Sequence, residues 1–539
     1  MPRWALLLFC AAYVLPGVFA RDPWRSADVA AFGHMVAMAE GRSPWLAPTV
    51  GQLPPDSALL PHWLGAASIA LLSPWIDAEL AARLPFALLL ALTLALVWYA
   101  MYHLARTEAA QPVAFAFGGE AEPVQYARAL ADGALLALIA TLGLLQLGHE
   151  TTPELMQLAA VALFQWALAA APFRRWRARA AALAALPLLA AAGAPGIALA
   201  IGAIGLAIAL RSAYPQVRRF APWVAASALA ALAVAAALHT WEWRWRLATD
   251  TAQVFQLGRL WLWFLWPAWL LALWTVWRWR HHLFNRHIAV PLSLALVALA
   301  ASIATGGSDR ALLLGLPGVA VLAAFALPTL ERSAAAAIDW FSVFFFSAGA
   351  IAVWVVYASM HTGVPAKPAA NVAKLASGFV PSFSAPALAA AVLGTLAWLW
   401  LVRWRTARHQ AALWKSLVLP AGGVALLWLL LMTLLLPVLD YARSDRPWVE
   451  RIARHVPPGA CVSAPDIGRA AAAALEHFGR WRVDARPATD AGGCDWMLLR
   501  RDAGGTGVPP GWSVIARVLR PTERQGGTLV LRRDAAAPR

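Results

Sequence analysis

Long apolar runs separated by short polar segments recur along most of the chain. A helix that crosses a bilayer needs about 20 mostly apolar residues, and somewhat fewer where the bilayer thins or flanking side chains reach the interface. The pattern therefore predicts about thirteen membrane spans. They cover residues 4–20, 80–104, 129–147, 155–172, 179–193, 197–210, 221–238, 260–277, 288–305, 311–328, 337–359, 384–402 and 416–437.

Composition agrees with a polytopic α-helical membrane protein. Of the 539 residues, 61% are hydrophobic and only 13% are charged, which is too apolar for a water-soluble fold of this size. The formal net charge of +16 would suit a nucleic-acid partner. The Lys and Arg residues, however, fall in short clusters between apolar runs rather than on a soluble domain, so we expect membrane lipids and no nucleic acid as partners.

These positive clusters predict the orientation of the chain. If 179–193 and 197–210 are two short spans, the four large clusters fall on the same side as the N-terminal "MPR", which the charge rule makes cytoplasmic. Merging the two spans would divide the clusters between both sides. The odd number of spans then places everything after residue 437 in the periplasm of a bacterium, with the protein in the inner membrane. The first run could instead be a cleaved signal peptide, but we favour an uncleaved anchor.

The composition changes sharply after the last span. Residues 438–539 are rich in Arg, Asp, Gly and Pro, and they predict a small α/β domain next to the membrane domain of residues 1–437. "WSVIARVL" (512–519) and "GTLVLRR" (527–533) are typical of strands, and "IGRAAAAALEHF" (467–478) is typical of a helix. Cys461 and Cys494 would form a disulfide in an oxidising periplasm and remain thiols in the cytosol.

Polar residues of the membrane domain gather in the loops that this orientation places outside. The first loop, residues 21–79, is the largest. Its residues 28–41 predict a helix lying on the membrane, with Asp28 as N-cap, and a second apolar helix follows. Carboxylates and basic residues at one membrane face favour a site for polar or charged substrates.

The first loop also carries a family resemblance. Trp24, Asp28, "GRSPWLAPTVG" (41–51), "LLPHW" (59–63) and "AELAARLPFALL" (78–89) occur in an order similar to the first periplasmic loop of the protein O-mannosyltransferase-like glycosyltransferases. The bacterial branch of that family includes the lipid A aminoarabinose transferase. The segment 306–324 resembles a second motif of the family. The resemblance implies a GT-C type fold with thirteen spans, interfacial helices in the first loop and a periplasmic C-terminal domain.

The resemblance further implies an activity, which is transfer of a sugar from a polyprenyl-phosphate donor to a lipid or protein acceptor. The catalytic Asp of the family would fall on Ala27, and its Glu-Lys-Pro motif on Asp56, Ser57 and Ala58. Either Asp28 or Asp22 would take the acidic role by a small shift. Asp28 is our candidate general base, although it could also serve only as a helix cap. Asp56 is the second catalytic candidate, with a surface carboxylate as the alternative.

Substrate and metal positions follow from the same comparison. A departing lipid phosphate needs cations, for which Arg83 and Arg310 are candidates, although each could simply mark the end of a span. Glu154 and Trp63 are candidate substrate-binding residues, and Glu154 could equally cap the helix that starts near Pro153. If a divalent metal takes part, Asp56, Glu150 and His239 are its candidate ligands.

Two other functions stay open at this point. A transporter or flippase for lipid-linked saccharides would use the same substrates, but the spans contain almost no ionisable residues for a polar path. A homologue that binds a lipid-linked sugar without transferring it is consistent with alanine at position 27. The identities of the sugar and of the acceptor are not encoded in any motif.

Overall fold

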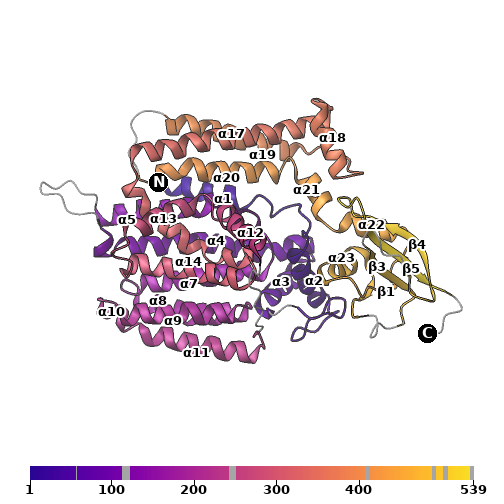
Figure 1. Ribbon diagram of the computed structural model, residues 1–539, viewed down its shortest axis with the longest axis horizontal. Coiled ribbons are helices and arrows are strands. Elements are labelled where there is room, and N and C mark those ends of the chain that lie inside the picture. The colour runs from indigo at the N-terminus through magenta and orange to yellow at the C-terminus, as the bar shows by residue number, and fades with distance from the viewer. Residues whose placement is uncertain are drawn as a thin grey trace.

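The computed structural model describes residues 1–55, 58–111, 122–241, 250–406, 413–487, 493–501 and 508–534. A bundle of long helices makes up most of the molecule, and a small sheet domain sits at one end of it (Figure 1). Helices α2 (Ala27–Ala39) and α3 (Leu59–Leu72) lie between the bundle and this C-terminal domain. The N-terminus lies at the opposite end of the bundle.

The bundle forms because its helices are apolar over most of their surface and pack on one extensive buried core. Its longer helices are α1 (Arg3–Val14), α4 (Ala78–Ala105), α5 (Pro123–Ala140), α7 (Pro153–Ala170), α8 (Arg175–Ala191), α9 (Pro195–Leu210), α11 (Ala221–Ala237), α12 (Thr251–Phe264), α13 (Ala268–Arg278), α14 (Arg286–Ala304), α16 (Leu316–Ala326), α17 (Arg332–Thr362), α19 (Ala385–Thr406) and α20 (Val418–Leu431). Shorter pieces connect them: α6 (Leu142–Leu147), α10 (Pro215–Arg218), α15 (Asp309–Leu313), α18 (Ala366–Leu375), α21 (Leu436–Arg443), η1 (Glu108–Ala110), η2 (Leu327–Thr329) and η3 (Leu413–Leu417).

Each predicted span overlaps at least one of these helices. By length and composition, 7 helices of the described chain can cross a membrane, or up to 8 if a bent pair counts as one span. The prediction that 179–193 and 197–210 are separate is confirmed. Helix α8 ends at Ala191, α9 begins at Pro195, and Gly193 adopts a φ of +92° in the turn, which glycine accommodates without strain.

Four of the predicted spans are wrong in being drawn as continuous. The span 260–277 is divided into α12 and α13, which are bent by 94°, because Pro267 has no N–H to continue the helix. The span 129–147 is divided at Thr141, whose backbone is extended. The spans 311–328 and 416–437 are likewise divided, into α15, α16 and η2, and into α20 and α21. Those spans were predicted from apolar composition, which does not show where a helix is interrupted.

The first loop differs from its prediction at the N-cap. Ser26, not Asp28, occupies the N-cap of α2, and Asp28 lies in the first turn. The helix is covered by other parts of the protein, since its residues from Val29 to Met38 are almost all buried. It packs against α3 on one side and against α23 (Arg469–Gly479) of the C-terminal domain on another.

The C-terminal domain is the predicted α/β unit. Its five strands are β1 (Cys461–Ser463), β2 (Arg482–Asp484), β3 (Trp496–Arg501), β4 (Trp512–Val518) and β5 (Gly527–Arg533), in the order β2-β1-β3-β5-β4. The first three strands of that order are parallel and the last three are antiparallel. Helix α22 (Arg446–Ala453) leads into the domain, and a Cys461–Cys494 disulfide joins β1 to the residues before β3.

The core of this domain includes side chains from the first loop. Val29, Ala37 and Val50 belong to the same buried cluster as residues of α22, α23 and the sheet. Gly33 allows the helices to approach closely, because a Cβ at this position would lie 2.4 Å from the Cβ of Ala473. The first loop is therefore held between the bundle and the C-terminal domain.

Candidate active site

Asp28 is enclosed by hydrogen-bond donors at the start of α2. Its side chain is almost fully buried, with a residue exposure of 1%. One carboxylate oxygen accepts from the backbone N–H and the hydroxyl of Thr151, both at 2.7 Å. The other accepts from the backbone N–H of Trp24 at 3.0 Å and from Arg21 Nη2 at 3.3 Å. Both oxygens of the carboxylate are thus fully engaged.

The surroundings of Asp28 stabilise its ionised form. Burial by itself would raise the pKa of this carboxyl, but the charges of Arg21 and Arg83 and the two hydrogen bonds from Thr151 outweigh burial and lower the pKa. An ionised carboxylate with a lowered pKa is a weak proton acceptor. Its four donors also leave it little freedom to turn toward a substrate.

Two buried arginines next to this carboxylate have N–H groups that no described acceptor engages. Arg21 Nη2 also donates to the carbonyl oxygen of His149 at 2.7 Å, and Arg83 Nη1 donates to that of Val18 at 3.4 Å. Within the described part of the chain, Arg21 Nε, Arg21 Nη1 and Arg83 Nε are buried with no acceptor. Buried N–H groups without partners are costly, and planar guanidinium groups suit phosphate oxygens.

A second cluster of charged side chains lies around Arg310. This arginine is on α15 and contacts the loop before α7 and the first turn of α7. Arg310 Nη2 lies 2.7 Å from Glu150 Oε2, and Arg310 Nη1 lies 3.2 Å from Glu154 Oε2. Gln146 also donates to Glu150 at 2.8 Å. Burial and the charge of Asp28 raise the pKa of Glu150, against the opposing effect of Arg310. The structure therefore brings the predicted residues Glu150, Glu154 and Arg310 together.

A cavity of about 200 Å³ opens next to these groups. Its lining residues come from α2, α3, α7, the α8–α9 turn and α23, and they are Ala27, Ala30, Ala31, His34, Pro55, Ala58, His62, Pro153, Glu154, Gln157, Ala192, Gly193 and Arg469. Ala27, the position of the expected family Asp, lines the cavity, whereas Asp28 is not among its lining residues. Glu154 is the lining carboxylate within the described chain.

The segment after the last membrane helix closes the site from the other side. Trp24 Nε1 donates to Asp440 at 2.6 Å, and burial raises the pKa of Asp440 to about 6. Arg446 forms a bidentate ion pair with Asp22 at 2.9 and 2.7 Å. Sequence reasoning missed Arg21, Asp440 and Arg446. The signal that could have indicated them is their position, since Arg21 directly follows the first apolar run and Asp440 and Arg446 follow the last.

The remaining predicted residues lie at different places. Trp63 on α3 donates its indole N–H to the carbonyl oxygen of Trp45 at 2.7 Å. His239 is exposed after the end of α11. Asp56 lies outside the described residues, so its predicted catalytic and metal-binding roles stay predictions.

The described residues do not fit a divalent metal. No three His, Cys, Asp or Glu side chains among them are grouped as a metal site requires. Glu150 is already engaged by Arg310 and Gln146, and a cation there would have to displace a guanidinium. We therefore derive no step through a metal.

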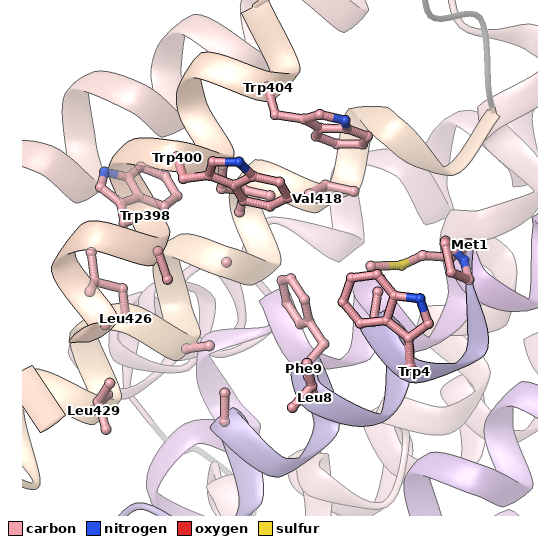
Figure 2. Close-up of a pocket in the computed structure, with 18 of the residues that line it drawn as sticks. Met1, Trp4, Leu8, Phe9, Trp398, Trp400, Trp404, Val418, Leu426 and Leu429 are labelled. Atoms are coloured by element: carbon pink, nitrogen blue, oxygen red, sulfur yellow. The ribbon is translucent and has the colours of Figure 1, made fainter.

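A larger cavity, of about 470 Å³, lies in the bundle toward the N-terminus. Figure 2 shows Trp4 and Phe9 of α1 facing Trp398, Trp400 and Trp404 of α19 across it. Its lining residues are apolar or aromatic and come from the first two residues of the chain, α1, α19, η3 and α20. Such a surface suits hydrocarbon chains, so the polar chemistry belongs to the other end of the bundle.

The helix bundle, the two helices of the first loop and the small C-terminal sheet make up a polytopic helical membrane fold of the GT-C type. Two solved structures share the fold over its whole length. ArnT from Cupriavidus metallidurans bound to undecaprenyl phosphate matches with a TM-score of 0.63 and 14% identity over 100% of both chains. The apo state of ArnT from the same organism matches with a TM-score of 0.63 and 15% identity over 99% of both chains. No protein-family model and no curated protein matches the chain.

Proposed function

We propose that this protein is a glycosyltransferase that moves a sugar from a polyprenyl-phosphate donor to a hydroxyl of a lipid or protein acceptor. The observation that carries the proposal is that buried arginine donors with no partner among the described residues lie at the same end of the bundle as a cavity lined by Glu154, linked to it through Asp28 and Thr151. The full-length likeness to ArnT, which binds undecaprenyl phosphate in one of its structures, supports the same substrate class.

The site would act at the periplasmic face of a bacterial inner membrane. The Cys461–Cys494 disulfide supports this location, because disulfides persist in oxidising compartments. The C-terminal domain that carries the disulfide lies at the same end of the bundle as the charged groups. The charge rule applied to the sequence gives the same orientation.

In the proposed reaction, the acceptor hydroxyl oxygen attacks the anomeric carbon while the bond from that carbon to the phosphate oxygen breaks. The electron pair of that bond leaves with the polyprenyl phosphate, and the hydroxyl proton passes to Glu154. We assign the base to Glu154 because it lines the cavity and retains one carboxylate oxygen that no described donor engages. Arg21 and Arg83 would offset the charge on the departing phosphate.

Asp28 then has a positioning role in place of the catalytic one that the sequence suggests. Its carboxylate fixes Arg21 and ties the start of α2 to the loop at Thr151. Arg310 holds Glu154 and Glu150 together and keeps the base oriented. Asp56 remains a further candidate for a catalytic or metal-binding role.

The experiment that tests the proposal is transfer by the purified protein in detergent with native lipid extract and radiolabelled polyprenyl-phosphate sugars. We expect Glu154→Gln to lower the rate by about 100-fold or more, as loss of a general base does, without lowering the melting temperature. Lys374→Gln, on the exposed helix α18, is the matched control and should keep full rate. Full activity of Glu154→Gln would remove Glu154 as the base.

One observation favours a second candidate, a protein that binds a lipid-linked sugar without transferring it. The position at which the related family carries its acid is Ala27, and this alanine lines the cavity. Retained binding of the lipid-linked sugar without transfer from any donor would support this candidate. A transporter or flippase has less support, because the cavity of about 470 Å³ and another of about 240 Å³ between α13 and α17 are lined almost entirely by apolar side chains.

A further inference from the structure

Small residues make room for the cavity at the first loop. Ala27, Ala30 and Ala31 form its wall on α2, and Gly193 forms part of the opposite wall. Its volume of about 200 Å³ is less than half that of the apolar cavity toward the N-terminus, which is about 470 Å³. It can therefore take one compact group rather than a polyprenyl chain.

Two histidines face this space from neighbouring helices. His34 is 2% exposed and His62 is 4% exposed, and their ring centroids lie 5.3 Å apart with the rings at 67°. Both line the cavity, together with Gln157 and Glu154. The lining therefore combines an alanine wall on α2 with several hydrogen-bonding side chains.

The hydrogen bonds of these histidines leave donors and acceptors for a ligand. His62 Nδ1 contacts the carbonyl oxygen of Ala58 and must donate to it, so the neutral ring presents Nε2 as an acceptor. Neither ring nitrogen of His34 has a partner among the described residues, although the side chain is buried. Such a pair of unmet groups is costly unless something binds there.

The two rings are uncharged at neutral pH. Burial lowers the pKa of His34 to about 3, with the neighbouring His62 and Arg469 acting in the same direction, and burial lowers the pKa of His62 to about 4. A neutral imidazole offers one donor and one acceptor and has no charge with which to attract an anion. Hydroxyl groups, which both donate and accept, match the two imidazoles, while Arg469 and Glu154 bring one charge of each sign to the same lining.

We propose that the cavity lined by His34 and His62 is the subsite for one uncharged sugar ring, whose hydroxyls the two imidazoles and Gln157 recognise. The inference rests on the proposed function and names the part of the substrate that this end of the site selects. The ring belongs either to the polyprenyl-phosphate donor or to a glycolipid acceptor. Glu154 would then lie beside this sugar, which is either the group transferred or part of the acceptor that receives it.

A third buried histidine supplies a matched control. His287 on α14 also has two ring nitrogens without a described partner, but it packs against the rings of Trp279 and Phe325 and does not line the cavity. Replacing His287 therefore removes the same chemical group from a buried position away from the cavity.

The test measures sugar-dependent binding by the full chain in lipid nanodiscs. In the donor arm the probes are undecaprenyl phosphate and the same lipid carrying one hexose. In the acceptor arm they are a diacylglycerol and the same diacylglycerol carrying one hexose. The quantity of interest is the ratio of the two Kd values in each arm. We expect His34→Leu and His62→Leu to reduce this ratio by about ten-fold or more in one arm, and His287→Leu to leave it unchanged.

The two arms identify the source of the sugar. A loss confined to the donor arm assigns the subsite to the donor, and a loss confined to the acceptor arm assigns it to the acceptor. If a leucine variant does not fold, Ala30→Leu, which fills the cavity from the α2 wall, should produce the same loss. An unchanged ratio in all variants, or a wild-type protein with no preference for sugar in either arm, would overturn the inference.

Failure of the proposed function gives a different result. A protein that transfers no sugar but shows a histidine-dependent preference for the sugar-bearing lipid would be a binder with the proposed subsite intact. Transfer activity with a histidine-independent preference would instead support the transferase and overturn the subsite.

Discussion

Two regions that α2 borders differ in how far their buried polar groups are hydrogen-bonded. Around Asp28, both carboxylate oxygens accept two hydrogen bonds each. Around the cavity, His34 is just as buried but has no described partner for either ring nitrogen. Saturated polar groups fix a structure, whereas buried unsatisfied groups beside a cavity indicate a place where a ligand completes the hydrogen bonds.

The same helix serves both regions because its faces point in different directions. Ala27, Ala30, Ala31 and His34 are spaced as one face of an α-helix, and that face lines the cavity. Asp28 is displaced from that face by one residue and meets Thr151 and Arg21 instead. A single step along the helix thus separates a structural carboxylate from the ligand-facing wall.

The largest expected effect follows from breaking the saturated region. Asp28→Ala leaves the buried Arg21 without its carboxylate, and removal of one partner of a buried pair costs about 3–5 kcal/mol of unfolding free energy. Thermal unfolding in detergent measures the loss. Glu40→Ala, which removes an exposed ion pair with Arg42 at the other end of the helix, should cost less than about 1 kcal/mol. Equal losses in the two variants would contradict the assignment of Asp28 as a structural group.

Acid should weaken the cavity region selectively. His62 has a folded pKa of about 4 against an ordinary value of 6.5, so the unfolded chain binds more protons between these values. The contribution of His62 to the unfolding free energy is therefore fully present above about pH 6.5. It is lost as the pH falls toward 4, by roughly 3 kcal/mol. His34 acts in the same direction, down to about pH 3.

The comparison that isolates this effect is between wild type and the double variant His34→Leu/His62→Leu. Carboxylates and other histidines titrate in both proteins, so the difference between the two melting curves reports the two imidazoles. We expect the gap between the melting temperatures to change steadily from pH 6.5 to pH 4. A constant gap over this range would mean that the rings are not kept neutral in the folded protein.

A smaller effect is expected when one hydrogen bond of the saturated region is removed. Thr151→Val deletes the hydroxyl donor to Asp28 but keeps the side-chain shape and the backbone donor. Loss of a hydrogen bond to a charged group should cost about 2 kcal/mol, measured by the same thermal unfolding. Thr362→Val, whose hydroxyl bonds only to exposed backbone at the end of α17, is the matched control and should be nearly neutral.

The smallest effect on stability is expected from filling the cavity. Ala30→Leu adds volume where the wall of α2 borders empty space, so the unfolding free energy should change by less than about 1 kcal/mol. The same change should abolish the sugar-dependent gain in binding. A large loss of stability in this variant would show that the space is not available to a ligand.

The sequence alone indicated much of the architecture. Apolar runs of membrane length, positive clusters on one side and a change of composition after residue 437 are properties that a linear chain displays directly. They predicted the helical bundle, the separation of α8 from α9, the helix α23 and the strands β4 and β5. The external loops and the family resemblance, rather than these patterns, singled out Glu150, Glu154 and Arg310, which the structure brings together.

Only the tertiary structure decided what these residues contact. Neighbouring helix positions differ by about 100° in direction, so a chain read residue by residue does not show that Ala27 lines a cavity while Asp28 turns away from it. The contacts of Arg21 with His149 and of Trp24 with Asp440 join residues 128 and 416 positions apart. Hydropathy and charge are local and can be read along the chain, whereas pairing, burial and the direction of a side chain arise only when distant segments pack together.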